Sequence, residues 1–198
     1  MSPAPSQQPN PHNPDLPYFE TETLQPADFD SAQEQFVTVV NIPCSAKNLF
    51  SIFEDADSWP KWVPGIGGVQ WTSEKPFAVG TTRTVFFWGG MEVYEEFGAW
   101  EDDRKMAFTF TGITQPVWTC FGELYEVEPQ GENDCQLTWT VAYTPRDVFA
   151  KIHFMVRPLM GLTFRLYMNR LKAYAKRYNA LSPSTSVTGA QNPDEIRS

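Results

Sequence analysis

The chain has 198 residues and a formal net charge of −9, with 41% hydrophobic and 15% aromatic residues. This length suits one domain with a sizeable core, and the negative charge argues against nucleic acid as the main partner, because a phosphate backbone attracts a basic face. The apolar runs are too short for a transmembrane helix, and the first residues lack the basic and apolar segments of a secretory signal. Three dispersed cysteines suit neither a disulfide framework nor a zinc site. We therefore expect a cytoplasmic protein without a metal or other cofactor.

The two ends of the chain differ from its middle in composition. Residues 1–33 are rich in Pro, Gln, Asn and Asp, which predicts a disordered or loosely packed arm. Residues 180–198 are polar and predict a disordered tail. The folded domain is expected over residues 34–179.

The domain is predicted to begin with a β-branched strand over residues 36–42. After Pro43, either Cys44 or Ser45 can cap a short helix, and the prolines at 60 and 64 then turn the chain sharply. Six more strand segments follow at residues 69–73, 81–88, 91–100, 105–111, 117–127 and 135–143. Gly89-Gly90 predicts a two-residue hairpin, and the short connections favour an antiparallel meander. Alternating apolar residues indicate one buried face per strand.

The last predicted element is a long helix over residues 158–178, after an irregular or briefly helical lead-in at 146–156. Pro158 suits a first helical turn, where its missing N–H is not needed. At about 100° per residue, a polar and basic side faces away from an apolar side. The polar side holds Arg165, Asn169, Lys172 and Lys176, and the apolar side holds Met160, Phe164, Tyr167, Leu171 and Tyr174.

Four segments in this order form a recognisable pattern: VTVVNIPCSAKNLFSIFEDADSWPKWVPGI, EEFGAWEDDRKMAFTF, GELYEVEPQGENDCQLTWTVAYTP and RLKAYAKRYN. The pattern resembles the START-like (SRPBCC) superfamily, and especially its polyketide cyclase/dehydrase and lipid-transport branch. The resemblance implies an α+β helix-grip fold, in which a curved antiparallel sheet of about seven strands wraps around the long C-terminal helix, with two short helices after the first strand. It also implies a cavity between sheet and helix that accepts an apolar molecule.

Given that fold, we expect large side chains to line the cavity. They come from the inner strand faces, from the long helix and from the Trp corner, which is the turn Trp59-Pro60-Lys61-Trp62. An ordinary packed core is the alternative for each of them, and the corner indoles could simply pack on the sheet edge. The hydroxyls of Thr163 and Tyr167 could orient a ligand. The expected lining residues are Trp59, Trp62, Phe87, Phe97, Phe108, Phe110, Phe121, Trp139, Met160, Thr163, Phe164 and Tyr167.

The candidates for acid/base chemistry are Arg83, Glu123 and His153. Arg83 shares strand parity with Val85 and Phe87, and Glu123 shares it with Phe121 and Tyr125, so both are expected to face inward. A carboxylate facing an apolar cavity can have a raised pKa and exchange protons with a substrate. His153 precedes the long helix, where a packed or surface role is the alternative. The sequence contains no Ser-His-Asp, Cys-His or phosphate-loop arrangement and no metal-ligand cluster.

These observations lead to three functional hypotheses. The first is binding or transport of an apolar small molecule, such as a lipid, isoprenoid or aromatic polyketide-like compound. The alternative is a metal-free cyclase, aromatase or dehydratase, which requires Arg83, Glu123, Tyr167 and His153 to converge. The third is an interaction protein that uses the N-terminal arm or the exposed helix face on a partner; the chain could also form a homodimer.

Overall fold

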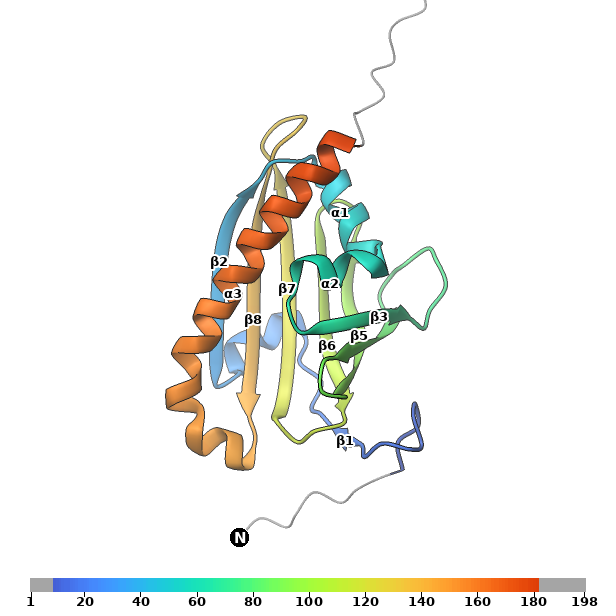
Figure 1. Ribbon diagram of the computed structural model, residues 1–198, viewed down its shortest axis with the longest axis vertical. Helices are drawn as coiled ribbons and strands as arrows, with labels where there is room; N and C mark the ends of the chain where they lie inside the picture. Colours follow the sequence, from blue (N-terminus) through green and yellow to red (C-terminus); the bar gives the residue numbers. More distant parts are fainter. Residues whose placement is uncertain (1–8, 182–198) are drawn as a thin grey trace, which may run out of the picture.

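The fold is a curved antiparallel sheet that grips one long helix. The computed structural model describes residues 9–181, so most of the predicted tail lies outside the described residues (Figure 1). The strands run in the order β2-β8-β7-β6-β5-β4-β3, with the short β1 paired to β6. Their bounds are β1 Phe19–Glu20, β2 Glu34–Ile42, β3 Ile66–Trp71, β4 Thr82–Phe87, β5 Glu92–Glu101, β6 Lys105–Ile113, β7 Trp118–Pro129 and β8 Cys135–Pro145. The predicted helix-grip architecture is confirmed.

Local sequence explains how the meander turns. The hairpin between β4 and β5 uses Gly89 and Gly90, whose φ angles of 88° and 83° place both in the left-handed region that side chains disfavour. Along β8, alternate residues from Leu137 to Tyr143 are buried against the helix side. The predicted inner face of this strand is therefore correct.

Two short helices close one end of the sheet, as expected. Helix α1, Ala46–Glu54, begins where the hydroxyl of Ser45 accepts a hydrogen bond from the backbone N–H of Asn48. A 3₁₀ turn, η2 Ala56–Ser58, leads into α2, Trp59–Trp62. In Figure 1 these helices cover the upper part of the sheet beside the end of the long helix.

The long helix α3 spans Asp147–Leu181, so the prediction that it starts at Pro158 is wrong. Pro158 lies inside the helix, where it removes one backbone hydrogen bond. Tertiary contacts hold the earlier turns in place. His153 is hydrogen-bonded to Tyr143 of β8, and Arg157 is paired with Glu34 of β2. None of the described helices is long and apolar enough to cross a membrane.

Residues 9–33 differ from the disordered or loosely packed arm that composition suggests. They follow the outer face of the sheet, where Leu24 and Phe29 are buried against Cys120 and Ala142. The segment includes the 3₁₀ turn η1, Pro26–Ser31. Phe29 packs so closely over Gly122 that a Cβ there would lie 2.9 Å from the ring. A few well-placed apolar residues therefore anchor a segment whose average composition is polar.

Candidate ligand-binding site

A cavity of about 190 Å³ lies between the inner face of the sheet, α2 and α3. Its volume is comparable to that of cavities that hold a small aromatic ring in protein cores, which are about 150 Å³. The wall is mostly apolar, with a few charged groups. Ten of the twelve expected lining residues are in the wall: Trp59, Trp62, Phe87, Phe108, Phe110, Phe121, Trp139, Met160, Phe164 and Tyr167.

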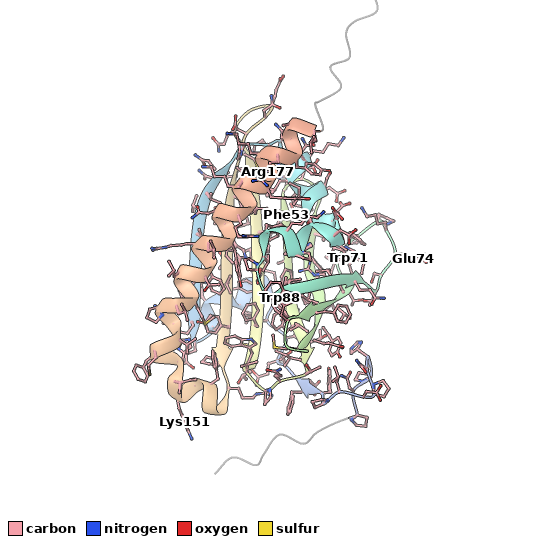
Figure 2. All side chains as sticks on the ribbon, in the orientation of Figure 1. Phe53, Trp71, Glu74, Trp88, Lys151 and Arg177 are labelled. Atoms are coloured by element: carbon pink, nitrogen blue, oxygen red, sulfur yellow. The ribbon has the colours of Figure 1, made fainter. Side chains whose placement is uncertain are left out.

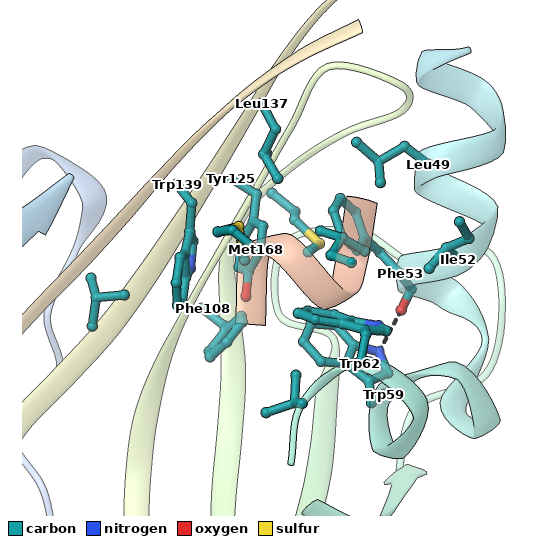
Figure 3. Close-up of a cluster of buried hydrophobic side chains, with 14 of the residues drawn as sticks. Leu49, Ile52, Phe53, Trp59, Trp62, Phe108, Tyr125, Leu137, Trp139 and Met168 are labelled. Carbon is teal, nitrogen blue, oxygen red and sulfur yellow. Dashed lines mark hydrogen bonds between the residues drawn. The ribbon is translucent and has the colours of Figure 1, made fainter. Parts of the chain in front are cut away.

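The Trp corner of α2 forms one end of the cavity. Trp59 and Trp62 pack together in the hydrophobic core (Figure 3). Their ring centroids are 4.7 Å apart, and both residues line the cavity wall. The indole N–H of Trp59 donates to the carbonyl of Phe53, whereas that of Trp62 is buried without a hydrogen-bond partner within residues 9–181. Each ring therefore serves both core packing and the cavity wall.

Arg83 and Glu95 form a buried ion pair in the wall. They lie directly opposite each other on β4 and β5, and Nε of Arg83 donates to a carboxylate oxygen of Glu95. The guanidinium carbon lies 4.1 Å from the ring centroid of Trp59 and 4.6 Å from that of Phe108, which adds cation–π stabilisation. Nη1 of Arg83 has no hydrogen-bond partner in the described part of the chain. Burial raises the pKa of Glu95, and the charge of Arg83 opposes that shift.

Glu123 of β7 is the second carboxyl group of the wall. Its Oε2 accepts hydrogen bonds from the Tyr125 hydroxyl at 2.5 Å and from the Trp139 indole at 3.0 Å. Burial raises the pKa of Glu123 to about 7, although both hydrogen bonds lower it, and the nearby charge of Glu95 raises it further. The pKa of Tyr125 is raised well above its usual value by burial and by the charge of Glu123. At neutral pH this site can hold or release a proton.

Three expected site residues lie outside the cavity wall. Phe97 is buried against Trp71 and Trp100, and the Arg83 guanidinium carbon lies 5.2 Å from its ring, so it supports the wall from behind. Thr163 donates its hydroxyl to the Leu159 carbonyl one helical turn earlier. The third, His153, belongs to a separate cluster.

His153 is buried where α3 meets β2 and β8. Its Nε2 lies 2.9 Å from the Tyr143 hydroxyl, and its Nδ1 lies 3.6 Å from Glu34. The ring of Tyr167 does line the cavity, but its hydroxyl donates to the Pro64 carbonyl. The four polar groups required for the catalytic hypothesis therefore do not converge: Arg83 and Glu123 share the cavity, whereas His153 and the Tyr167 hydroxyl are engaged elsewhere.

Sequence reasoning missed several wall residues. Glu95 could have been found, because it shares strand parity with Val93 and stands opposite Arg83 on a neighbouring strand. The others are apolar or aromatic residues without a distinguishing local signal: Val63, Ile66, Val85, Met91, Val93, Trp118 and Tyr125. Within residues 9–181, no group of three or more His, Cys, Asp or Glu side chains could hold a metal ion.

The family model described as polyketide cyclase / dehydrase and lipid transport matches residues 33–176. The chain belongs to this family. Uncharacterized proteins of Mycobacterium tuberculosis and Mycobacterium bovis are 35% identical over 147 residues, which are 73% of this chain and 86% of each relative.

Solved structures of this START-like superfamily share the fold at low sequence identity. An aromatase/cyclase from a Streptomyces species, called Zhui, has a TM-score of 0.61 at 12% identity, covering 73% of this chain and 94% of its own. A START superfamily protein from Mycobacterium smegmatis has a TM-score of 0.60 at 15% identity, covering 72% and 97%. Family and fold together support binding of a hydrophobic ligand or cyclase activity in general terms.

Proposed function

We propose that this protein binds or transports a small apolar molecule, of one or two rings or a short chain, in the cavity between the sheet and α3. The observation that carries the proposal is the ring-lined cavity of about 190 Å³ itself. Removing an apolar molecule of this size from water is favourable, and aromatic walls suit aromatic or isoprenoid ligands. Two buried N–H groups, Nη1 of Arg83 and the indole N–H of Trp62, have no hydrogen-bond partner among residues 9–181, which favours a ligand with an oxygen acceptor. A cytoplasmic location is part of the proposal.

Two measurements test this function. Native mass spectrometry of the protein from its own host, followed by organic extraction, should find an apolar molecule at one per chain. Calorimetric titration with naphthalene should show binding that Met160→Trp abolishes, because the larger ring fills the cavity. Val79→Trp is the control, since Val79 is 66% exposed and absent from the wall. A cavity that holds nothing and does not take up naphthalene would contradict the proposal.

A second candidate function is metal-free cyclase or dehydratase chemistry, favoured by one observation. Glu123, with a pKa near 7, lies in the same wall as the Arg83–Glu95 pair. A group that titrates near neutral pH can both take and give a proton, while the cavity holds a flexible substrate in a reactive shape.

The enzymatic candidate is tested with an organic extract of the host. The protein should convert a component to a product that has lost water, detected by mass spectrometry, and Glu123→Gln should abolish this conversion without abolishing ligand binding. Glu128→Gln is the matched control, because Glu128 is exposed at the end of the same strand. Equal conversion by both variants would remove Glu123 from any catalytic role.

A further inference from the structure

The outward side of α3 carries a row of exposed apolar side chains. They recur at intervals of three and four residues, which keeps them within one arc of about 80° on the helix surface. We name this row the α3 stripe; it consists of Ile152, Met155, Leu159, Leu162 and Leu166, which are 46–68% exposed. It is about 21 Å long. Contiguous exposed apolar surface of this kind marks an interaction site in soluble domains.

The same helix is strongly basic, although the chain as a whole is acidic. Residues 148–181 contain seven Lys or Arg residues and no Asp or Glu, whereas the net charge of the chain is −9. Lys151 and Arg177, near the two ends of α3 in Figure 2, show how far this basic character extends. The helix is therefore attracted to negative charge, while much of the remaining surface is repelled by it.

A basic recess follows the stripe along the helix. It has a volume of about 150 Å³ and is lined by Lys61, Arg170, Ala173, Tyr174 and Arg177. Arg170 and Arg177 lie four and eleven residues after Leu166, which is the spacing that continues the line of the stripe. The recess is large enough for a phosphate group and offers three cations to it. The α3 stripe and the basic recess therefore lie one after the other along one side of α3.

We propose that α3 docks this protein on anionic phospholipid membranes, with the α3 stripe among the acyl chains and the basic recess on a lipid phosphate. A helix with leucines on one side and lysines and arginines around them lies in the plane of a membrane interface. A second copy of the chain fits less well, because pairing two α3 helices would bring their basic residues together. Nucleic acid would leave the leucines in water.

This docking has a consequence for the cavity. The turns of α3 that carry Leu159, Leu162 and Leu166 outward also present Met160, Phe164 and Tyr167 inward to the cavity. A membrane-bound α3 would therefore place the wall of the cavity next to the apolar phase of the bilayer. The docking itself depends only on the outer side of the helix. Its test is therefore independent of whether the cavity holds a ligand.

The test is flotation of the full chain with vesicles. We expect binding to phosphatidylcholine vesicles with about 30 mol% phosphatidylglycerol to be at least roughly tenfold stronger than to pure phosphatidylcholine, and to weaken as salt rises. Leu159→Ser/Leu162→Ser should lower binding at least about tenfold. Val37→Ser/Val39→Ser is the matched control, since both valines are exposed on strand β2, and it should bind as the wild type does. Arg170→Gln/Arg177→Gln should reduce the preference for the anionic vesicles.

Three results would overturn the proposal. The first is that the wild type does not bind the anionic vesicles. The second is that Leu159→Ser/Leu162→Ser floats as the wild type does, with its circular dichroism spectrum unchanged. The third is sedimentation of the wild type as a dimer that this double substitution converts to a monomer, because the stripe would then be covered by a second copy.

Discussion

Two clusters that each contain a tyrosine, a glutamate and an arginine occupy different surroundings in this fold. The cavity cluster consists of Arg83, Glu95, Glu123 and Tyr125, and its members line the cavity between the sheet and α3. The helix cluster consists of Glu34, Tyr143, His153 and Arg157, and it joins α3 to β2 and β8.

Burial distinguishes the ion pairs of the two clusters, although Tyr143 and His153 of the helix cluster are themselves buried. The side chains of Arg83 and Glu95 are 1% and 5% exposed, whereas those of Arg157 and Glu34 are 48% and 18% exposed. Little water reaches a buried ion pair, so solvent does not compensate Nη1 of Arg83, which has no hydrogen-bond partner in the part of the chain that the structure describes. An exposed pair is completed by solvent. The same residue types therefore join a helix to the sheet in one place and line an apolar cavity in the other.

The largest expected difference between the clusters is in their arginines. Arg83→Met should lower the free energy of unfolding by about 4 kcal/mol, because it leaves Glu95 buried and unpaired. Arg157→Met should cost far less, since its ion pair is open to water. Urea titration measures both. Arg83→Met/Glu95→Leu, which removes both charges, should recover most of the loss; a double variant as unstable as the single one would contradict this account.

The next effect concerns the pH dependence of stability. The pKa of Glu123 is raised from 4.5 to about 7, so its ionisation opposes folding. Below pH 4.5 the carboxyl is protonated in both the folded and the unfolded state, so it does not lower the free energy of unfolding. That free energy falls as the pH rises through about 7. The difference in free energy of unfolding between Glu123→Gln and the wild type should therefore grow by on the order of 2–3 kcal/mol between about pH 5 and about pH 8, in favour of the variant. A difference that does not change with pH would mean that Glu123 titrates normally.

The smallest effect distinguishes the two tyrosines. Tyr143→Phe removes the hydrogen bond to His153 and should cost about 1 kcal/mol, without changing how Glu123 titrates. Tyr125→Phe removes a hydrogen bond that stabilises the ionised Glu123, so it should move the pKa of that carboxyl further upward. Carbon-13 NMR of the glutamate carboxyl groups measures the shift. If Tyr143→Phe moved the Glu123 pKa as much, the two clusters would be one coupled network.

The sequence by itself determined the elements whose signals are local. Alternation identified the inner face of β8, and Gly89-Gly90 identified the hairpin between β4 and β5. The cap of α1 was narrowed to Cys44 or Ser45, and the structure has Ser45 there. Strand parity also indicated that Arg83 and Glu123 face inward, which is where the structure has them. These features depend on neighbours within a few residues, so the local sequence is enough to predict them.

Tertiary structure decided what depends on contacts between distant segments. Pro158 is a start signal locally, but α3 begins at Asp147 because β2 and β8 hold its first turns. Residues 9–33 look polar on average, yet the outer face of the sheet buries Phe29. The pairing of Arg83 with Glu95 and the rings stacked behind them likewise required strands to come together. Burial and pairing of this kind stabilise the protein only after distant segments have come together, so no local sequence pattern specifies these contacts.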